Sequence, residues 1–324
     1  MSYTNGLDKP SDYFNTVLYT GDGTSGRTIS GVGFQSDFLW IKSRSNVTNH
    51  SLTDVIRGGD VQLRSNTNEP ESQFGSQDIT FTSDGFTNAG TTSNNSGFTF
   101  VAWNWLASNT TASNTDGSIN STVSVNTTSG FSIVKYTGTG SQATVGHGLG
   151  VAPKMIIVKR LQNAEDWAVY HASNGAGTYQ SLNTTEAKQN NPNRFNVAPT
   201  SSVFTVNTHE SVNFAENYIA YCFAEKKGYS KFGSYTGNGN ADGTFVYTGF
   251  KPAFTILKKS SGTDNWVLHD NKRSDVPNAN VNDQVVYPNS NAAELSSSTR
   301  AIDTVSNGFK CRGSGGNINA SDET

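Results

Sequence analysis

The pentapeptide pattern Tyr-Thr-Gly-x-Gly occurs three times in this chain, beginning at Tyr19, Tyr136 and Tyr235. The copies lie 117 and 99 residues apart, and similar residues follow each tyrosine at the same distances for 35 residues without a gap. A tripeptide ending in lysine, Trp-Ile-Lys, Ile-Val-Lys or Ile-Leu-Lys, begins 21 residues after each tyrosine. Repetition of this kind predicts copies of one structural unit, and units this long are small domains rather than turns of a solenoid.

The pattern inside each copy is typical of β-structure. Runs such as KMIIVKR and AFTILKK are short, rich in β-branched residues and bounded by proline, glycine and polar residues. Two copies end in an aromatic segment with alternating large and small residues, FTFVAWNWLA from Phe98 and NYIAYCFAEK from Asn217. No window gives an amphipathic helix of more than two turns. We therefore predict an all-β chain of three tandem antiparallel β-sandwiches, jelly-roll or lectin-like, of about 100 residues each.

The repeats and the polar segments around them divide the chain into an arm, three sandwiches and a linker. We expect an N-terminal arm at residues 1–15, sandwich repeats at residues 16–107, 131–227 and 228–324, and a flexible polar linker at residues 108–130. Only the segment EKKGYSKFG separates the last two repeats, so we expect them to pack closely. The third repeat lacks the final aromatic strand. We expect truncation of the chain after Thr324, with completion of the sheet by a partner strand as the alternative.

The composition argues against several classes of function. Charged residues make up 15% of the chain and hydrophobic residues 34%, against about 25% and about 45–50% in average globular proteins. The chain nevertheless has 18 Phe, 12 Tyr and 5 Trp, which argues against disorder. A net charge of −3 predicts no nucleic-acid partner, and the lack of a long apolar run predicts no membrane insertion.

Motifs for catalysis, cofactors and metals are weak. The glycines after Tyr136 lack the Gly-Lys-Ser/Thr sequence of a phosphate-binding loop and precede a strand-like run. His147 lies between two glycines, but no serine elbow or aspartate partner accompanies it, and the other two copies have no histidine there. Cys222 and Cys311 lack metal-ligand spacing and are too few for a disulfide framework, so we expect buried free thiols. We therefore predict no catalytic residue, no cofactor and no metal, and a protein that is not an enzyme.

Acidic and basic residues recur together 35 and 38 residues after the repeated tyrosine. Asp54 and Arg57 in the first copy match Asp270 and Arg273 in the third, whereas the second copy has His171 at the first position. One interpretation, which we favour, is a local ion pair that ties the end of a strand to the next loop. The alternative is a polar pocket present in two copies, which makes Asp54 and Asp270 candidate binding residues.

Tryptophan recurs 31 residues after the tyrosine in the last two copies, as Trp167 and Trp266. In polar β-domains such residues form platforms that stack on sugars, so both are candidate glycan-binding residues. Large aromatic residues are also what a small sandwich needs to fill its core, and this is the interpretation we favour. Solvent exposure of the two side chains distinguishes these interpretations.

Several longer segments resemble a known group of proteins. The segments KPSDYFNTVLYTGDG, GVGFQSDFLWIKSRS, NTDGSINSTVSVN and FSIVKYTGTGSQATVGHGLGVAPKMIIVKR are similar to tandem-repeat virion proteins of tailed bacteriophages. These are fibre-like or appendage proteins of marine podoviruses and cyanophages. The resemblance implies a non-enzymatic structural protein on the surface of the phage particle, a fibre, spike or decoration of the tail or head that contacts the host.

The resemblance also implies partners. We expect the N-terminal arm to join other virion proteins of the tail, neck or capsid, and the chain to form a homo-oligomer. The alternative function is an array of carbohydrate-binding modules, an adhesin that recognises a host-surface glycan.

Overall fold

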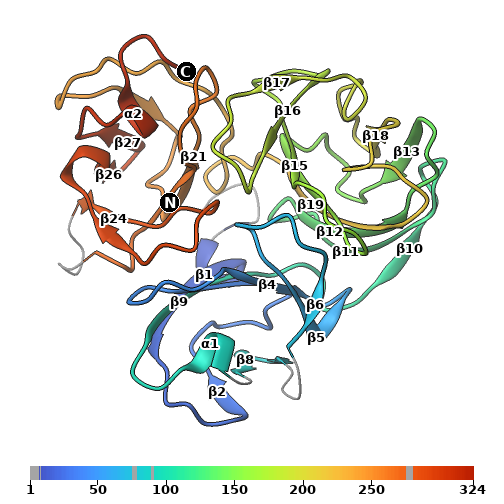
Figure 1. Cartoon of the computed structure of the whole chain (residues 1–324), viewed down its shortest axis with the longest axis horizontal. Helices are drawn as coiled ribbons and strands as arrows, with labels where there is room; N and C mark the ends of the chain where they lie inside the picture. The colour runs from blue at the N-terminus through green and yellow to red at the C-terminus, as the bar shows by residue number, and fades with distance from the viewer. Residues whose placement is uncertain (1–6, 8, 75–78, 89–90, 275–279) are drawn as a thin grey trace.

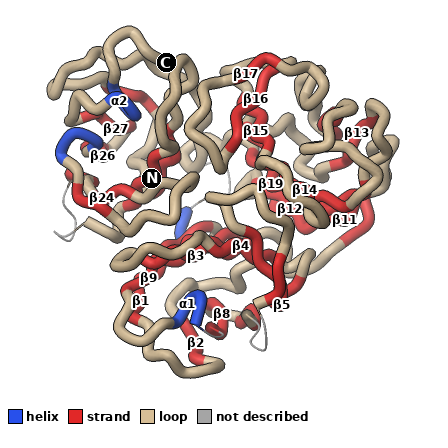
Figure 2. Tube along the Cα trace, in the orientation of Figure 1, coloured by secondary structure: helices blue, strands red, loops and turns tan. Residues whose placement is uncertain are grey.

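The computed structural model of the chain describes residues 7, 9–74, 79–88, 91–274 and 280–324. Nearly all of its regular structure is antiparallel β-sheet, arranged in three lobes around a common centre (Figure 1). Long loops join the strands (Figure 2), and no helix in the described ranges is long and apolar enough to cross a membrane. The helical segments are single turns: η1 (Pro10–Asp12), α1 (Thr91–Asn94), η2 (Ser298–Arg300) and α2 (Gly316–Asn319). The prediction of an all-β chain is confirmed.

The first lobe, residues 9–107, is a sandwich of two sheets. The larger sheet has the order β1-β9-β3-β4-β5-β6, and the smaller one β2-β8-β7. The strands are β1 (Phe14–Thr20), β2 (Arg27–Ile29), β3 (Phe38–Ser43), β4 (Ser51–Asp54), β5 (Gly58–Leu63), β6 (Ser72–Gln73), β7 (Thr80–Thr82), β8 (Gly85–Asn88) and β9 (Thr99–Trp105). Leu39 and Ile41 of β3 pack with Phe86 of β8 between the sheets, so Trp40 points to the opposite face of β3.

The second lobe, residues 108–227, has an eight-stranded sheet of order β10-β11-β12-β19-β14-β15-β16-β17, covered by the pair β13-β18. Its strands are β10 (Ala112–Asn114), β11 (Ser121–Asn126), β12 (Phe131–Thr137), β13 (Ala143–Gly146), β14 (Met155–Arg160), β15 (Ala168–His171), β16 (Thr178–Ser181), β17 (Gln189–Asn190), β18 (Val203–Val206) and β19 (Asn217–Phe223). The segment expected to be a flexible linker, residues 108–130, instead contributes β10 and β11. Its valines, among them the buried Val123, alternate with polar residues, which allows β11 to pair with β12 along six residues.

The third lobe, residues 228–324, has smaller sheets. They are the four-stranded sheet β20-β27-β26-β23 and the pairs β21-β22 and β24-β25. The strands are β20 (Phe245–Tyr247), β21 (Phe254–Leu257), β22 (Val267–Asp270), β23 (Val281–Asn282), β24 (Gln284–Val285), β25 (Leu295–Ser296), β26 (Ile302–Val305) and β27 (Gly308–Cys311). Among its described residues there is no strand in the position that β9 and β19 hold in the other two lobes.

One hairpin recurs in all three lobes. The strands β3, β14 and β21 begin at Phe38, Met155 and Phe254, which are 117 and 99 residues apart, as the tyrosines of the repeated motif are. Their partners β4, β15 and β22 have the same spacing. The gapless stretch of sequence similarity therefore corresponds to strand pairs with the same register.

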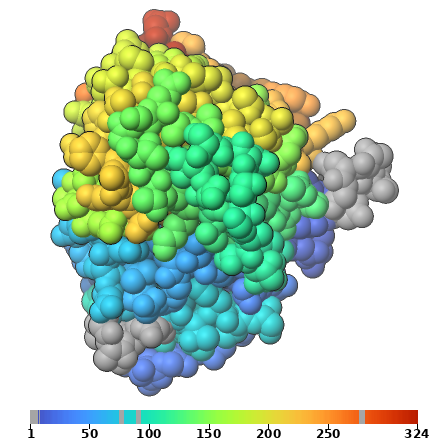
Figure 3. All heavy atoms as spheres, turned by 90° about the vertical axis from the view of Figure 1, so that its right-hand side faces the viewer, coloured from blue at the N-terminus to red at the C-terminus, as the bar shows by residue number. Residues whose placement is uncertain are grey.

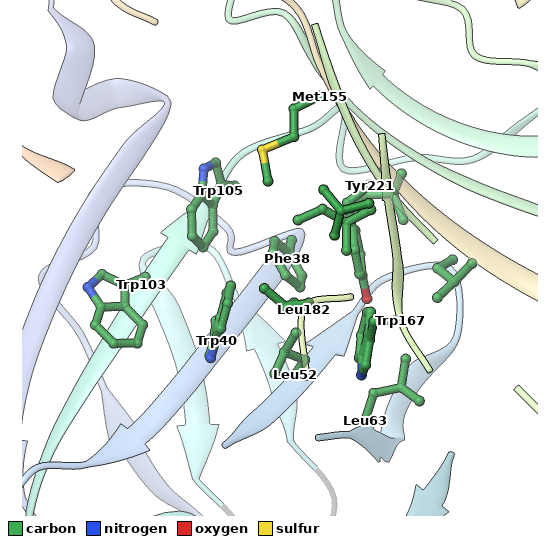
Figure 4. Close-up of a cluster of buried hydrophobic side chains, with 14 of the residues drawn as sticks. Phe38, Trp40, Leu52, Leu63, Trp103, Trp105, Met155, Trp167, Leu182 and Tyr221 are labelled. Atoms are coloured by element: carbon green, nitrogen blue, oxygen red, sulfur yellow. The ribbon is translucent and has the colours of Figure 1, made fainter. Parts of the chain in front are cut away.

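The three lobes share one hydrophobic core at the centre of the molecule. The space-filling view shows the first and second lobes meeting in a continuous surface (Figure 3). Figure 4 shows aromatic side chains of both lobes pointing toward one another there, with Tyr221 of β19 next to Phe38 of β3. The core also contains Trp266 and Leu268 of the third lobe. The lobes are therefore packed into one body, because each buries the face of its main strands against the others.

Candidate functional site

The two tryptophans that were candidates for sugar binding are core residues. Trp167 is fully buried and Trp266 is 3% exposed. The Trp167 Nε1–H donates to the Arg64 carbonyl at 3.0 Å, and the Trp266 Nε1–H donates to the Ser181 carbonyl at 2.9 Å. Each bond joins one lobe to the lobe before it in the sequence. Neither indole face is available to stack on a sugar, so both are core residues, the interpretation favoured from the sequence, and the glycan-platform alternative is not supported.

His50 is the residue of the first lobe at the same position. Its Nδ1 accepts a hydrogen bond from Trp40 Nε1 at 2.8 Å, and its Nε2 lies 3.1 Å from the Tyr287 carbonyl in the third lobe. Burial lowers its pKa to about 3, so the ring is neutral and its Nε2 donates to that carbonyl. The three equivalent residues therefore join the lobes in a closed ring, each contacting the backbone of a neighbour.

Asp54 and Asp270 form the predicted local ion pairs, but in a buried setting. Asp54 Oδ2 lies 2.6 Å from Arg57 Nε, and Asp270 Oδ2 lies 2.6 Å from Arg273 Nε, with all four side chains at most 1% exposed. Burial alone would lower the pKa of Arg57, but the Asp54 carboxylate raises it above its usual value. Breaking such a pair leaves an uncompensated charge in the core. The pocket interpretation is not supported, since neither carboxylate is open to a ligand.

Each carboxylate also accepts a hydrogen bond from the aromatic strand of another lobe. The Tyr221 hydroxyl of β19 donates to Asp54 Oδ2 at 2.9 Å, and Trp103 Nε1–H of β9 donates to Asp270 Oδ2 at 2.8 Å. These contacts connect residues 167 positions apart in both cases. The ion pairs are therefore joints between lobes as well as local links between strand and loop.

In the second and third lobes the lysine of the repeated tripeptide also bonds to another lobe, whereas Lys42 Nζ bonds to the Ser43 and Asn46 carbonyls of its own lobe. Lys159 Nζ donates to the Asn68 carbonyl of the first lobe at 3.2 Å, and Lys258 Nζ lies 3.4 Å from the Thr185 carbonyl of the second. Burial lowers the pKa of Lys42, Lys159 and Lys258 to about 8 each, against opposing effects of nearby carboxylates. Buried ammonium groups that donate to carbonyls have an architectural role here.

The remaining chemically active residues are also structural. His147 is buried; its Nδ1 accepts from the Leu149 N–H at 3.1 Å, and its Nε2 lies 3.2 Å from the Thr200 carbonyl, so the ring holds its glycine-rich loop against a neighbouring loop. Cys222 and Cys311 are buried free thiols, as predicted, and burial raises the pKa of Cys311 to about 11. No cluster of three or more metal-ligating side chains occurs in the described ranges.

A cavity of about 1070 Å³ among the described residues has room for a ligand. It lies beside β21 and is lined by the aromatic residues Phe14, Trp105, Phe223, Phe232 and Phe254, among others. His171 also lines it, at the position that Asp54 and Asp270 hold in the other lobes.

Comparison with known proteins places the chain in a family without a known function. No curated protein and no solved structure matches it. The model of a family described as a domain of unknown function, DUF7483, matches residues 9–324, and the chain belongs to this family.

Proposed function

We propose that this protein is a non-enzymatic structural component of a tailed-phage particle. In this proposal it is an appendage on the surface of the tail or head that takes part in host contact. Its sequence resemblance to phage appendage proteins is the starting point. The observation that carries the proposal is that the repeated Asp, Trp, His and Lys side chains are buried in contacts within and between lobes.

Because the repeated polar side chains are buried in contacts within and between lobes, they favour an architectural role for the protein. A body whose lobes are joined by buried ion pairs and aromatic residues resists separation of the lobes, which suits a protein exposed on a particle. The alternative of a glycan-binding array gains no support, because Trp167 and Trp266 are buried.

Electron microscopy of the phage particles tests this proposal. Gold-labelled antibody to the protein is expected to mark one location on purified particles. Deletion of residues 1–6, the start of the arm proposed at residues 1–15, is expected to remove the label, since the arm is proposed to join the protein to its virion partners. A protein that is abundant in the lysate but absent from particles, and that sediments as a monomer without affinity for particle proteins, would contradict the proposal.

A further inference from the structure

Phe214 is a large apolar side chain on the surface of the second lobe. It lies in the loop between β18 and β19 and is 47% exposed. Hydrogen bonds fix the backbone on both sides of this ring. The Phe214 N–H donates to the Tyr218 hydroxyl at 2.8 Å, and the Phe214 carbonyl accepts from the Glu216 N–H at 2.7 Å. The loop therefore holds an apolar ring in contact with solvent at a defined position.

The other two lobes have no aromatic residue at the equivalent position. In each lobe an asparagine side chain accepts a hydrogen bond from the backbone N–H three residues after the repeated tyrosine. These asparagines are Asn94, Asn213 and Asn319. The residue that follows is Asn95 in the first lobe, Phe214 in the second and Ala320 in the third. The fold therefore does not require an aromatic side chain here, and the exposed ring is particular to the second lobe.

One face of the Phe214 ring lies against Arg160, the last residue of β14. The guanidinium carbon is 5.4 Å from the ring centroid, and the Arg160 side chain is 8% exposed. Glu216 accepts two hydrogen bonds of 2.7 Å from this guanidinium, and Glu210 accepts one of 2.8 Å. The bonds from Arg160 lower the pKa of Glu216 to about 2, so its carboxylate is ionised. Arg160 thus has its counter-ions without Phe214.

Oriented polar groups of the same cluster keep free hydrogen-bonding atoms. Asn163 Nδ2 donates to Glu216 Oε1 at 2.7 Å, and Gln162 Oε1 accepts from the Asn217 N–H at 2.8 Å, so both amides are held in place. Three side-chain atoms have no partner in the part of the chain that the structure describes: Asn163 Oδ1, Gln162 Nε2 and Glu210 Oε1. The side chain of Glu210 is half exposed. Two acceptors and one donor are thus open to a ligand.

This arrangement matches the chemistry of a neutral sugar ring. A pyranose has an apolar face of C–H groups that packs on an aromatic ring, and its hydroxyls both donate and accept hydrogen bonds. One guanidinium and two carboxylates give the cluster a net charge of −1, which disfavours an anion. Arg160 already occupies the place that a cationic ligand would take beside the ring and the carboxylates. A single exposed ring is too small for a protein partner, which needs about 800 Å² on each side.

We propose that Phe214 and the polar groups around it form a binding site for a neutral pyranose. The sugar stacks on the exposed face of the Phe214 ring, and its hydroxyls bond to Glu210, Asn163 and Gln162. Because one aromatic face and three polar groups make all the contacts, the dissociation constant for a monosaccharide lies in the millimolar range. The rigid loop compensates in part, since the ring and the amides are already in place before the sugar binds.

The site occurs once in the chain. Its counterparts in the other lobes have Asn95 or Ala320 in place of the aromatic ring, so it is distinct from a repeated array of sugar-binding modules built on Trp167 and Trp266. The inference rests on this cluster alone and does not depend on the proposed role in a phage particle.

Saturation-transfer NMR on the full 324-residue chain tests the proposal. The probes are the methyl glycosides of glucose, galactose, mannose and N-acetylglucosamine, added one at a time. We expect saturable transfer from the protein to the ring protons of at least one glycoside. The matching methyl glucuronide or galacturonide is expected to bind about three-fold more weakly, because its carboxylate meets a cluster with a net negative charge. Equal or tighter binding of the acidic sugar would overturn the assignment to a neutral ring.

Substitutions locate the site. Phe214→Ala is expected to weaken binding about five-fold or more. Phe214→Leu keeps an apolar cover over Arg160 but lacks the aromatic face, so it should lose affinity while its Tm stays within about 2 °C of the unaltered protein. The matched control is Phe245→Ala, which removes a ring that is 46% exposed in β20 and should leave binding unchanged. Absence of saturable transfer from all four glycosides, full affinity in Phe214→Leu, or an equal loss in Phe245→Ala would overturn the proposal.

Discussion

In the described ranges, the first two lobes have strands beside the central hairpin that the third lobe lacks, and that difference explains most of what distinguishes them. In the first two, the hairpin that begins at Phe38 or Met155 continues through β9 or β19 into β1 or β12. In the third, the hairpin at Phe254 stands alone, and the residues of β21 are half-buried where those of β3 and β14 are buried. One strand thus completes both the sheet of its own lobe and the core shared by all three.

The same difference separates three equivalent polar residues. Asp54 and Asp270 are buried and bonded to the aromatic strand of another lobe, whereas His171 faces the cavity. A carboxylate at this position therefore links two lobes, because it accepts a hydrogen bond from the aromatic strand of a different lobe. Substitutions at these positions, at pH-sensitive joints and at the paired core strands test it.

The largest effect is expected at the acidic joints. Asp54→Ala should lower the free energy of unfolding by about 3–5 kcal/mol, because Arg57 loses its close buried counter-ion and keeps Glu71, which lies 3.6 Å away. Asp270→Ala should cost less than Asp54→Ala, since Glu294 Oε2 remains 2.7 Å from Arg273 Nη1. The matched change His171→Ala should cost less than about 1 kcal/mol, since no strand of another lobe bonds to it in the described ranges. Urea unfolding measures all three. Equal losses at the three positions would refute the comparison.

Acidification is expected to weaken the ring of contacts between lobes. Burial lowers the pKa of His50 to about 3 and of His269 to about 4, whereas an unfolded histidine titrates near 6.5. Between pH 6.5 and 4 the unfolded state therefore binds more protons, and stability falls as the pH falls, by up to about 1.4 kcal/mol per pH unit for each histidine. Urea titrations from pH 7.5 to pH 5 measure the slope. A His50→Gln variant should show a shallower slope, and an unchanged slope would exclude His50 as a source.

The smallest effect is expected in the strands themselves. Ile157→Val in β14 removes a methyl group from a side chain that is 4% exposed and should cost about 1 kcal/mol. Ile256→Val in β21, at the equivalent position beside the cavity, should cost less than about 0.5 kcal/mol, because the methyl group loses fewer contacts there. Thermal unfolding of the two variants and the unaltered protein gives both values.

The sequence predicted the local structure well where strands repeat. The spacing of Tyr19, Tyr136 and Tyr235 located the hairpins, because period and register are set by residues close together in the chain. It failed at residues 108–130, where polar composition suggested a linker and β11 pairs with β12 instead. The alternation of Val123 and Val125 with polar residues indicated a strand. The many serines, threonines and asparagines around them indicated a linker instead, and this second pattern was given more weight.

By itself, then, the sequence determined the β-structure and the position of each central hairpin, because alternation and turn residues act over a few positions. The sequence already favoured core positions for Trp167 and Trp266 and local ion pairs for Asp54 and Asp270. Only the tertiary structure decided that each of the four side chains also bonds to a residue of another lobe. Which surfaces meet depends on how the three lobes pack the faces of their main strands against one another. No local sequence pattern specifies this packing.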